Sequence, residues 1–148
     1  MQQRVYEEIQ AIFGNDHMIS PTYQDLQEMK YLELVIKESL RLYPPVPSFS
    51  RILNQEAKFD DKIKLPKGLT LTLYALLLHR DPSVFPDPEK FDPDRFLPEN
   101  STKRSPYAYV PFSAGSRNCI GQRFAMLELK STVFKIIRQF ELLPVYNH

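Results

Sequence analysis

Residues 111–122 of this 148-residue chain read PFSAGSRNCIGQ, and this segment constrains the structure more tightly than any other. Its spacing is F-x-x-G-x-R-x-C-x-G, and the residues at the specified positions are Phe112, Gly115, Arg117, Cys119 and Gly121. Glycines let a backbone turn tightly and approach a flat ligand closely. A helical pattern begins just after Cys119, and the N-terminal end of a helix favours a thiolate. The segment therefore predicts a loop that presents Cys119 as a thiolate ligand.

The chemistry that suits such a thiolate is axial ligation of haem iron. A thiolate ligand pushes electron density toward cleavage of the O–O bond of oxygen, and backbone N–H groups around the sulfur tune that donation. We expect Phe112 to shield the thiolate from water and Arg117 to pair with a haem propionate. Gly115 and Gly121 complete the cofactor-binding set of this loop.

Two other interpretations of Cys119 stay open at this point. A free cysteine is often no more than a small buried apolar residue. The second alternative is a cysteine nucleophile, which requires a nearby histidine base. The candidate bases are His17, His79 and His148, and none of them forms a recognisable motif with the thiol.

The composition bounds the remaining possibilities. Apolar residues make up 43% and charged residues 25% of the chain, as in globular proteins. The formal net charge of +1 gives no reason to expect a nucleic-acid partner. The single cysteine excludes an internal disulfide and fits a reducing compartment. No apolar run reaches the roughly 18 residues that a membrane-spanning helix needs.

Hydrophobic periodicity predicts a mainly α-helical chain with a small antiparallel β component. Thr22 and Asp25 resemble a capping box ahead of a short helix. Residues 81–111 are expected to be ordered, proline-rich coil with one helical turn. The expected helices cover 2–13, 23–29, 31–42 and 121–139, and the expected strands lie near 50–53, 57–59, 62–64 and 69–74. On the last helix, the residues suited to burial are Phe124, Leu127, Thr132 or Val133, Phe134, Ile136 and Ile137.

Two further segments complete the pattern. Residues 38–41, ESLR, form E-x-x-R on a predicted helix, where the i, i+3 spacing puts both charged side chains on one face. Residues 91–96, FDPDRF, follow, and the cysteine segment comes last. In this order the three motifs resemble the cytochrome P450 superfamily, whose P-E-R-F segment has glutamate where this chain has Asp94. Ser116 stands where many members have proline, which affects the stiffness of the loop and leaves the ligand untouched.

The resemblance covers nearly the whole chain and is strongest to eukaryotic microsomal members of the family-4 group. It implies the C-terminal portion of the cytochrome P450 fold: helices, short β-strands, proline-rich coil, the cysteine loop and a long final helix. Residues 1–148 would then form one partial P450 domain. The N-terminal anchor, the oxygen-activating helix and the final β-hairpin of the family are expected to be absent from this chain.

The resemblance also implies roles for residues outside the loop. The members of a buried Glu–Arg–Arg network would be Glu38, Arg41 and Arg95, and arginine suits this role because its planar fork bonds two partners. Positions that meet haem propionates are Arg51 and His79. The substrate pocket would be lined by Val46, Pro47 and Phe49. The plainer alternatives are that these last five residues pack a turn, end a strand or support the backbone by hydrogen bonds.

Basic residues surround the cysteine segment, and the family docks an acidic electron donor on the thiolate side of its haem. Charge of this kind raises association rates. The cations expected to take part are Lys103, Arg104, Arg123 and Lys130. The alternative is an ordinary solvated face.

The implied activity is that of a haem-thiolate monooxygenase, which uses haem b (iron protoporphyrin IX) to insert one oxygen atom of O₂ into a lipophilic or fatty-acid-like substrate. The implied electron donor is NADPH–cytochrome P450 reductase, and the implied location is the cytosolic face of the endoplasmic reticulum membrane. The alternative is an incomplete, non-catalytic haem-binding fragment. We expect the isolated chain to be inactive, because the family's oxygen-activating pattern has no counterpart in it and no catalytic residue can be assigned with certainty.

Overall fold

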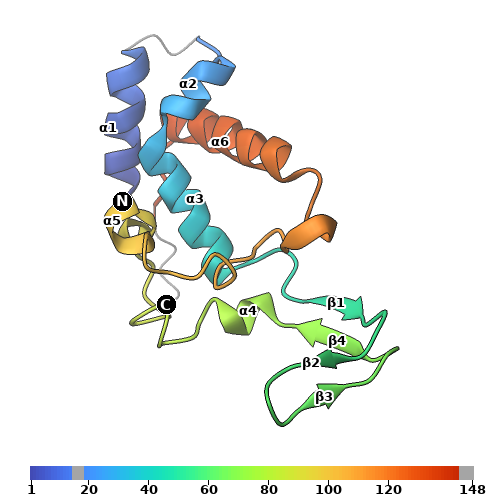
Figure 1. Cartoon of the computed structure of the whole chain (residues 1–148). Coiled ribbons are helices and arrows are strands. Elements are labelled where there is room, and N and C mark those ends of the chain that lie inside the picture. The colour runs from blue at the N-terminus through green and yellow to red at the C-terminus, as the bar shows by residue number, and fades with distance from the viewer. Residues whose placement is uncertain (15–18, 144–148) are drawn as a thin grey trace. The chain divides into compact units, whose positions relative to one another are not determined.

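The computed structural model describes residues 1–14 and 19–143. The chain forms two compact units: unit 1 comprises 1–39, 92–103 and 119–148, and unit 2 comprises 40–91 and 104–118. The helices, labelled in Figure 1, are α1 (Gln2–Phe13), α2 (Tyr23–Glu28), α3 (Lys30–Leu42), α4 (Ala75–Leu78), α5 (Pro98–Ser101) and α6 (Gln122–Gln139). Two 3₁₀ turns are η1 (Pro93–Phe96) and η2 (Gly115–Arg117). The strands are β1 (Phe49–Ile52), β2 (Ala57–Lys58), β3 (Lys64–Leu65) and β4 (Thr70–Leu73).

The core of unit 1 lies where α1 and α2 pack against α6 (Figure 1). Val5 and Ile9 are one turn apart on α1 and are both buried. The ring of Phe13 lies 4.8 Å from that of Phe134 on α6, measured between centroids. The other buried apolar residues of this core are Leu26, Met29, Leu32, Ile36 and Ile137.

Side chains cap the starts of α2 and α3 in unit 1. The predicted capping box is confirmed: Asp25 N–H donates to Thr22 Oγ1, and Thr22 N–H donates to Asp25 Oδ2 at 2.7 Å. The start of α3 is capped from a distance, because Glu8 on α1 accepts the backbone N–H groups of Tyr31 at 2.6 Å and Leu32 at 2.9 Å. A carboxylate at this end satisfies N–H groups that have no partner within the helix and also faces the positive end of the dipole.

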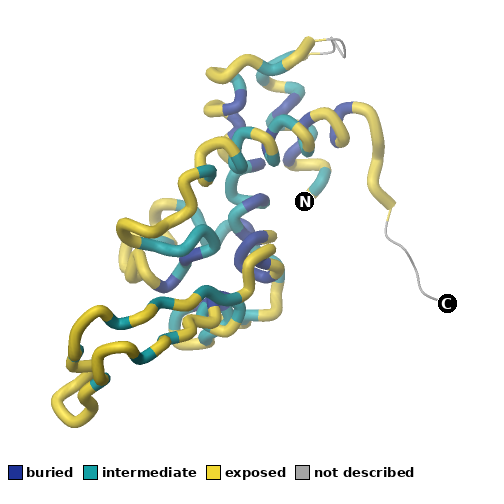
Figure 2. The backbone as a smooth tube through the Cα atoms, turned by 90° about the vertical axis from the view of Figure 1, so that its right-hand side faces the viewer, coloured by how far each residue is buried: buried dark blue, intermediate teal, exposed yellow. Residues whose placement is uncertain are grey.

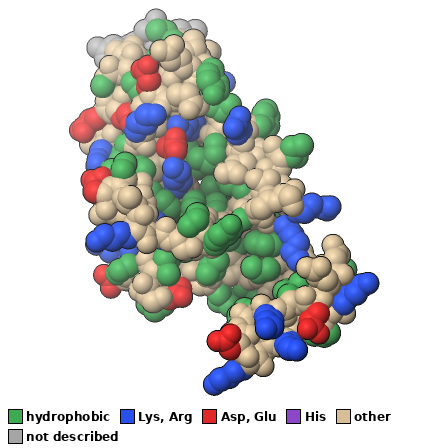
Figure 3. All heavy atoms as spheres, viewed as in Figure 1, with side chains coloured by type: hydrophobic (Ala, Val, Ile, Leu, Met, Phe, Trp, Pro, Cys, Tyr) green, Lys and Arg blue, Asp and Glu red, His purple; other side chains and the backbone are tan. Residues whose placement is uncertain are grey.

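Unit 2 contains two small antiparallel sheets, in which β1 pairs with β4 and β2 pairs with β3. Arg51 stands opposite Leu71, and the hydroxyl groups of Ser50 and Thr72 lie 2.9 Å apart across the first pair. The hairpin around the second pair, residues 54–68, is mostly exposed (Figure 2) and carries side chains of both charge signs (Figure 3). The buried apolar residues of unit 2 are Leu40, Leu42, Ala75, Phe85, Ala108 and Val110.

The predicted class, mainly helical with small antiparallel sheets, is confirmed, as are the four expected helices, each to within one residue at either end. The expectation of coil across 81–111 is wrong in part. Pro93 and Pro98 occupy the first positions of η1 and α5, where a missing N–H costs nothing and the fixed φ suits a helical turn. The short helix α4 was not predicted either, because a single turn leaves no periodic signal.

The expected buried face of α6 needs correction. Phe124 is 70% exposed and Ile136 is 38% exposed, whereas Phe134 and Ile137 are buried as predicted. Ile136 lies two residues from Phe134, which is about 200° around a helix with 3.6 residues per turn. Among the residues that the structure describes, no helix combines the length and apolar character required to cross a membrane.

Glu8→Ala is expected to destabilise the chain by about 1 kcal/mol, because the first turn of α3 loses the acceptor for two N–H groups. Glu7→Ala is the matched control, since the neighbouring carboxylate bonds Gln3 on the surface of the same helix. Urea unfolding of both variants gives the comparison. Equal midpoints for the two would show that Glu8 does not act as a cap.

Candidate functional site

Cys119 belongs to unit 1 and has an exposed, free thiol. It lies three residues before the first residue of α6, and its carbonyl accepts the N–H of Gln122 at 3.4 Å. A Cβ added at Gly121 would lie 3.8 Å from the sulfur, so glycine keeps that side of the sulfur bare. Gly121 has φ −85°, which any residue can adopt, so the turn does not require glycine at this position, and close approach to a flat ligand stays a prediction. Its use is the space that it leaves beside the thiol.

The segment of the loop that precedes Cys119 belongs to unit 2 and is held by Arg51. One guanidinium nitrogen of Arg51, on β1, donates to Ser113 Oγ at 2.9 Å and to the carbonyl of Arg117 at 3.1 Å. Ser113 has φ 62° and Gly115 has φ 81°. The left-handed region costs nothing at glycine, whereas at Ser113 it is unfavourable and requires support from its surroundings. Arg51 provides that support through the hydroxyl.

His79 lies inside unit 2 and is fully buried. Its Nε2 accepts the N–H of Val110 at 2.8 Å, its carbonyl accepts Arg41 Nη1 at 2.9 Å, and its ring lies 5.1 Å from that of Tyr109. Burial is the largest cause that lowers the pKa of His79 to about 4; the Arg41 backbone opposes it, and the charges of Arg41 and Arg80 lower the pKa further, so the ring is neutral near pH 7. A neutral ring that accepts at Nε2 carries its proton on Nδ1, which has no hydrogen-bond partner among the described residues.

Of the predicted charge network, Glu38 and Arg41 are fully buried and Arg95 is partly buried. In unit 1, Glu38 Oε1 accepts the N–H of Asp92 at 2.8 Å and lies 3.5 Å from Nε of Arg95. Glu38 therefore holds the start of the 92–95 turn. Arg41, three residues further along α3, belongs to unit 2 and donates to the carbonyls of His79 and Lys90.

Of the predicted substrate residues, Val46 and Pro47 lie between α3 and β1, and Phe49 is the first residue of β1. Val46 is 57% exposed, and the carbonyl of Pro47 accepts the N–H of Leu76 at 3.1 Å. The guanidinium of Arg51 lies 5.2 Å from the ring centre of Phe49. Contact of these residues with substrate stays a prediction.

The expected set of docking cations is wrong for Lys130, which is only 2% exposed because it is buried in a hydrogen-bonded ion pair. Arg104 stacks on Phe85, with its guanidinium 4.5 Å from the ring centre. Lys103 and Arg123 are exposed. Of the alternative bases for a cysteine nucleophile, His17 and His148 lie outside the described residues.

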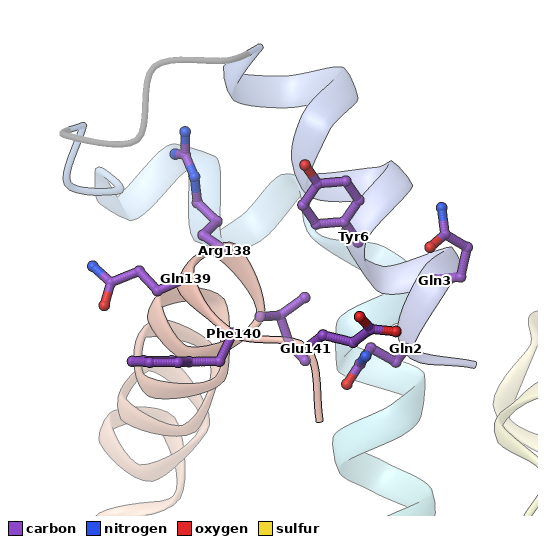
Figure 4. A pocket seen from close by; sticks show the side chains of 8 residues that line it. Gln2, Gln3, Tyr6, Arg138, Gln139, Phe140 and Glu141 are labelled. Atoms are coloured by element: carbon purple, nitrogen blue, oxygen red, sulfur yellow. The ribbon is translucent and has the colours of Figure 1, made fainter. Parts of the chain in front are cut away.

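A cavity of about 310 Å³ opens in unit 1 between α1 and the end of α6 (Figure 4). None of the predicted site residues lines it. Its lining residues are Gln2, Gln3, Tyr6, Ile137, Arg138, Gln139, Phe140 and Glu141.

The single thiol of Cys119 fits a metal ion whose other ligands come from a macrocycle. Within residues 1–14 and 19–143, no group of three or more His, Cys, Asp or Glu side chains converges as metal ligands do. A single exposed sulfur is what a haem requires, because the porphyrin supplies the four in-plane nitrogens and the protein supplies an axial ligand. The orphaned Nδ1–H of His79 is a buried donor suited to an anionic group.

Residues 1–147 match the family model "Cytochrome P450". The chain therefore belongs to the cytochrome P450 family, and the resemblance found in its three motifs is confirmed.

Curated relatives place the chain near the family-4 members, as its motifs indicated. It is 48% identical over 141 residues to cytochrome P450 4c3 of Drosophila melanogaster, covering 95% of this chain and 26% of that protein. It is 50% identical over 140 residues to cytochrome P450 4V2 of Mus musculus, covering 95% of this chain and 26% of that protein. It is 50% identical over 143 residues to cytochrome P450 4X1 of Homo sapiens, covering 97% of this chain and 28% of that protein. The chain thus spans about a quarter of the length of these relatives.

Arg51→Lys is expected to loosen the turn that precedes Cys119, because one ammonium cannot bond the carbonyl of Ser50 and also reach Ser113 and Arg117, as the two guanidinium nitrogens do. Loss of one such charged hydrogen bond, worth about 1.5 kcal/mol, should speed amide exchange at Ser113 and Asn118 about tenfold. Arg80→Lys is the control, since Arg80 pairs with Glu89 on the surface. Hydrogen exchange measured by mass spectrometry over residues 110–118 would contradict the role of Arg51 if both variants matched the parent chain.

The buried imidazole of His79 should make stability depend on pH. Its folded pKa of about 4 lies below the ordinary value of 6.5, so the unfolded chain binds more protons between these values. Its contribution is complete above pH 6.5 and is lost as the pH falls toward 4, by up to about 3 kcal/mol. His79→Gln, which cannot titrate, should remove this component. The difference in unfolding free energy between parent and variant, measured from pH 7 to pH 4, would be constant if His79 were accessible to protons in the folded state.

Proposed function

We propose that this protein is a haem-thiolate monooxygenase in which Cys119 is the axial ligand of the iron. The observation that carries the proposal is the free, exposed thiol of Cys119, three residues ahead of α6, in a chain of the cytochrome P450 family. A nucleophilic role for the thiol lacks support, because His79 is buried with its Nε2 bonded to Val110.

The cofactor we propose is haem b. Residues of the loop would shape its surroundings, with Gly121 leaving space beside the sulfur and Gly115 allowing the turn before it. Arg51, His79 and Arg117 are the proposed partners of the propionates, and Phe112 is the proposed shield against water. When bound, the haem would supply oxygen activation, assisted by electron donation from the thiolate.

This chain's own contribution would be to hold the ligand and its neighbours in place. Arg51 fixes the turn through Ser113 and Arg117, and Glu38 fixes the coil through Asp92 and Arg95. Binding, orientation and exclusion of water are the tasks that a protein performs for a cofactor of this kind. We include Glu38, Arg41 and Arg95 in the proposal as supports of the loop.

The substrate, donor and location follow from the family and stand as proposals. The substrate would be small and lipophilic or fatty-acid-like, meeting Val46, Pro47 and Phe49, and would receive one atom of O₂. NADPH–cytochrome P450 reductase would supply electrons. Lys103 and Arg123 are the exposed cations with which an acidic donor could pair. The location would be the cytosolic face of the endoplasmic reticulum membrane.

Cys119→Ser is expected to abolish the long-wavelength Soret band of the ferrous–CO complex, because a serine hydroxyl stays protonated near neutral pH and donates far less charge to iron. Ser116→Ala, three residues away in the same loop, should leave that band unchanged. Absorbance spectra of both haem-reconstituted variants after reduction and addition of CO provide the measurement. An unaltered band in Cys119→Ser would remove Cys119 from the iron and the proposed function with it.

A further inference from the structure

Lys130 is a buried cation on α6 that joins three helices of unit 1. It is 2% exposed, and its ammonium donates to the carbonyl of Leu26 at 2.8 Å and to Oε2 of Glu33 at 2.8 Å. Leu26 lies on α2 and Glu33 on α3, both of which lie near α6 in Figure 1. One side chain therefore connects elements about 100 residues apart in the sequence.

The two acceptors are the groups that a cation at this junction should find. Leu26 lies within the last four residues of α2, whose carbonyls lack partners inside the helix and form the negative end of its dipole. Glu33 lies in the first turn of α3, where a carboxylate faces the positive end of that helix. Lys130 thus bonds the C-terminal end of α2 and the carboxylate of Glu33 near the N-terminus of α3 at the same time.

Glu33 stays ionised in this arrangement. Burial by itself raises the pKa of Glu33, but hydrogen bonds and charges from Lys130 and Lys37 outweigh burial and lower the pKa to about 2. Lys37 lies 2.8 Å from Oε1, four residues away on the same helix, and is about one-third exposed. Of these two lysines, Lys130 is the one that bonds Glu33 from another helix.

Hydrogen bonds of this kind restrict how α6 can sit. Contacts between apolar side chains tolerate small slides of one helix along another. An ammonium bonded to two fixed oxygens keeps both bonds at one register only. A shift of α6 by one residue would turn the side chain of Lys130 by about 100° and break both bonds. The contact therefore sets both the height and the rotation of α6 against α2 and α3.

Cys119 is coupled to this helix through a short turn. The carbonyl of Gly121 accepts the N–H of Ala125 at 2.8 Å, which is the first helical bond of α6, and the carbonyl of Cys119 accepts Gln122 N–H. Few atoms separate the thiol from the first turn, so the position of α6 determines where the sulfur lies within unit 1.

We propose that Lys130 is a positioning residue, which fixes the register of α6 and thereby the placement of the Cys119 thiol. The role rests on the proposed ligation of haem iron by Cys119, and it gives the helix behind the ligand a specific anchor about eleven residues downstream. A positioning residue differs from a merely stabilising one in its effect on the folded protein. Its loss alters the iron–sulfur bond even where the chain has not unfolded.

The test compares Lys130→Met with Lys37→Met in the haem-loaded protein. Each variant removes one amine from Glu33, but only the first disconnects α6. At urea concentrations well below the unfolding midpoint, Lys130→Met should lower the ratio of thiolate-type to shorter-wavelength ferrous–CO absorbance about tenfold, equivalent to about 1.4 kcal/mol. Lys37→Met should leave this ratio unchanged.

Glu33→Gln gives a milder second variant should Lys130→Met fail to fold. It keeps the shape of the side chain and one oxygen acceptor but removes the charge, so the ratio should fall in the same direction by a smaller factor. If the variant that folds gives the same spectrum as the parent protein at urea concentrations well below the unfolding midpoint, the positioning role is overturned. This holds even if the unfolding midpoint itself drops. A Cys119→Ser variant with an unchanged spectrum would instead reject the ligand assignment itself, so the two failures are distinguishable.

Discussion

A charged side chain that leaves water must find partners inside the protein, and this requirement organises both units of the chain. In unit 1, Glu38 holds the 92–95 turn against α3, and Lys130 joins α6 to Glu33. In unit 2, Arg41 donates to two backbone carbonyls of the coil. Each contact links segments far apart in the sequence. The irregular stretches are therefore held by charge in places where they have few apolar side chains to bury.

The thiol of Cys119 contrasts with these satisfied interior groups, because it is exposed and unbridged. Exposure suits a ligand that must meet a large planar cofactor, whereas a buried cysteine would act as a small apolar residue. Gly121 keeps the neighbouring space free of a side chain. Side chains thus pack around the residues that hold the loop, while the proposed ligand itself stays exposed.

Local patterns in the sequence made part of the fold predictable. The capping box of Thr22 and Asp25 and the helix periods of α1 and α3 depend on residues within a few positions of one another. The burial of Lys130 could not be predicted in this way, because it depends on Leu26 and Glu33, about 100 residues earlier. A lysine read alone predicts a solvated cation, and only the tertiary contact reverses that expectation.

In the cysteine loop, too, the residue types could be recognised from the sequence but their bonding partners could not. The spacing of its glycines, arginine and cysteine identified the family, yet it gave no sign that Arg51 would bond Ser113 and the carbonyl of Arg117. That contact matters under the proposed ligation, because a site with a single protein–metal bond has no second protein ligand to correct an error in the first. Accuracy must then come from the backbone on either side of the sulfur. Arg51 restrains the residues before it, and α6 restrains those after it.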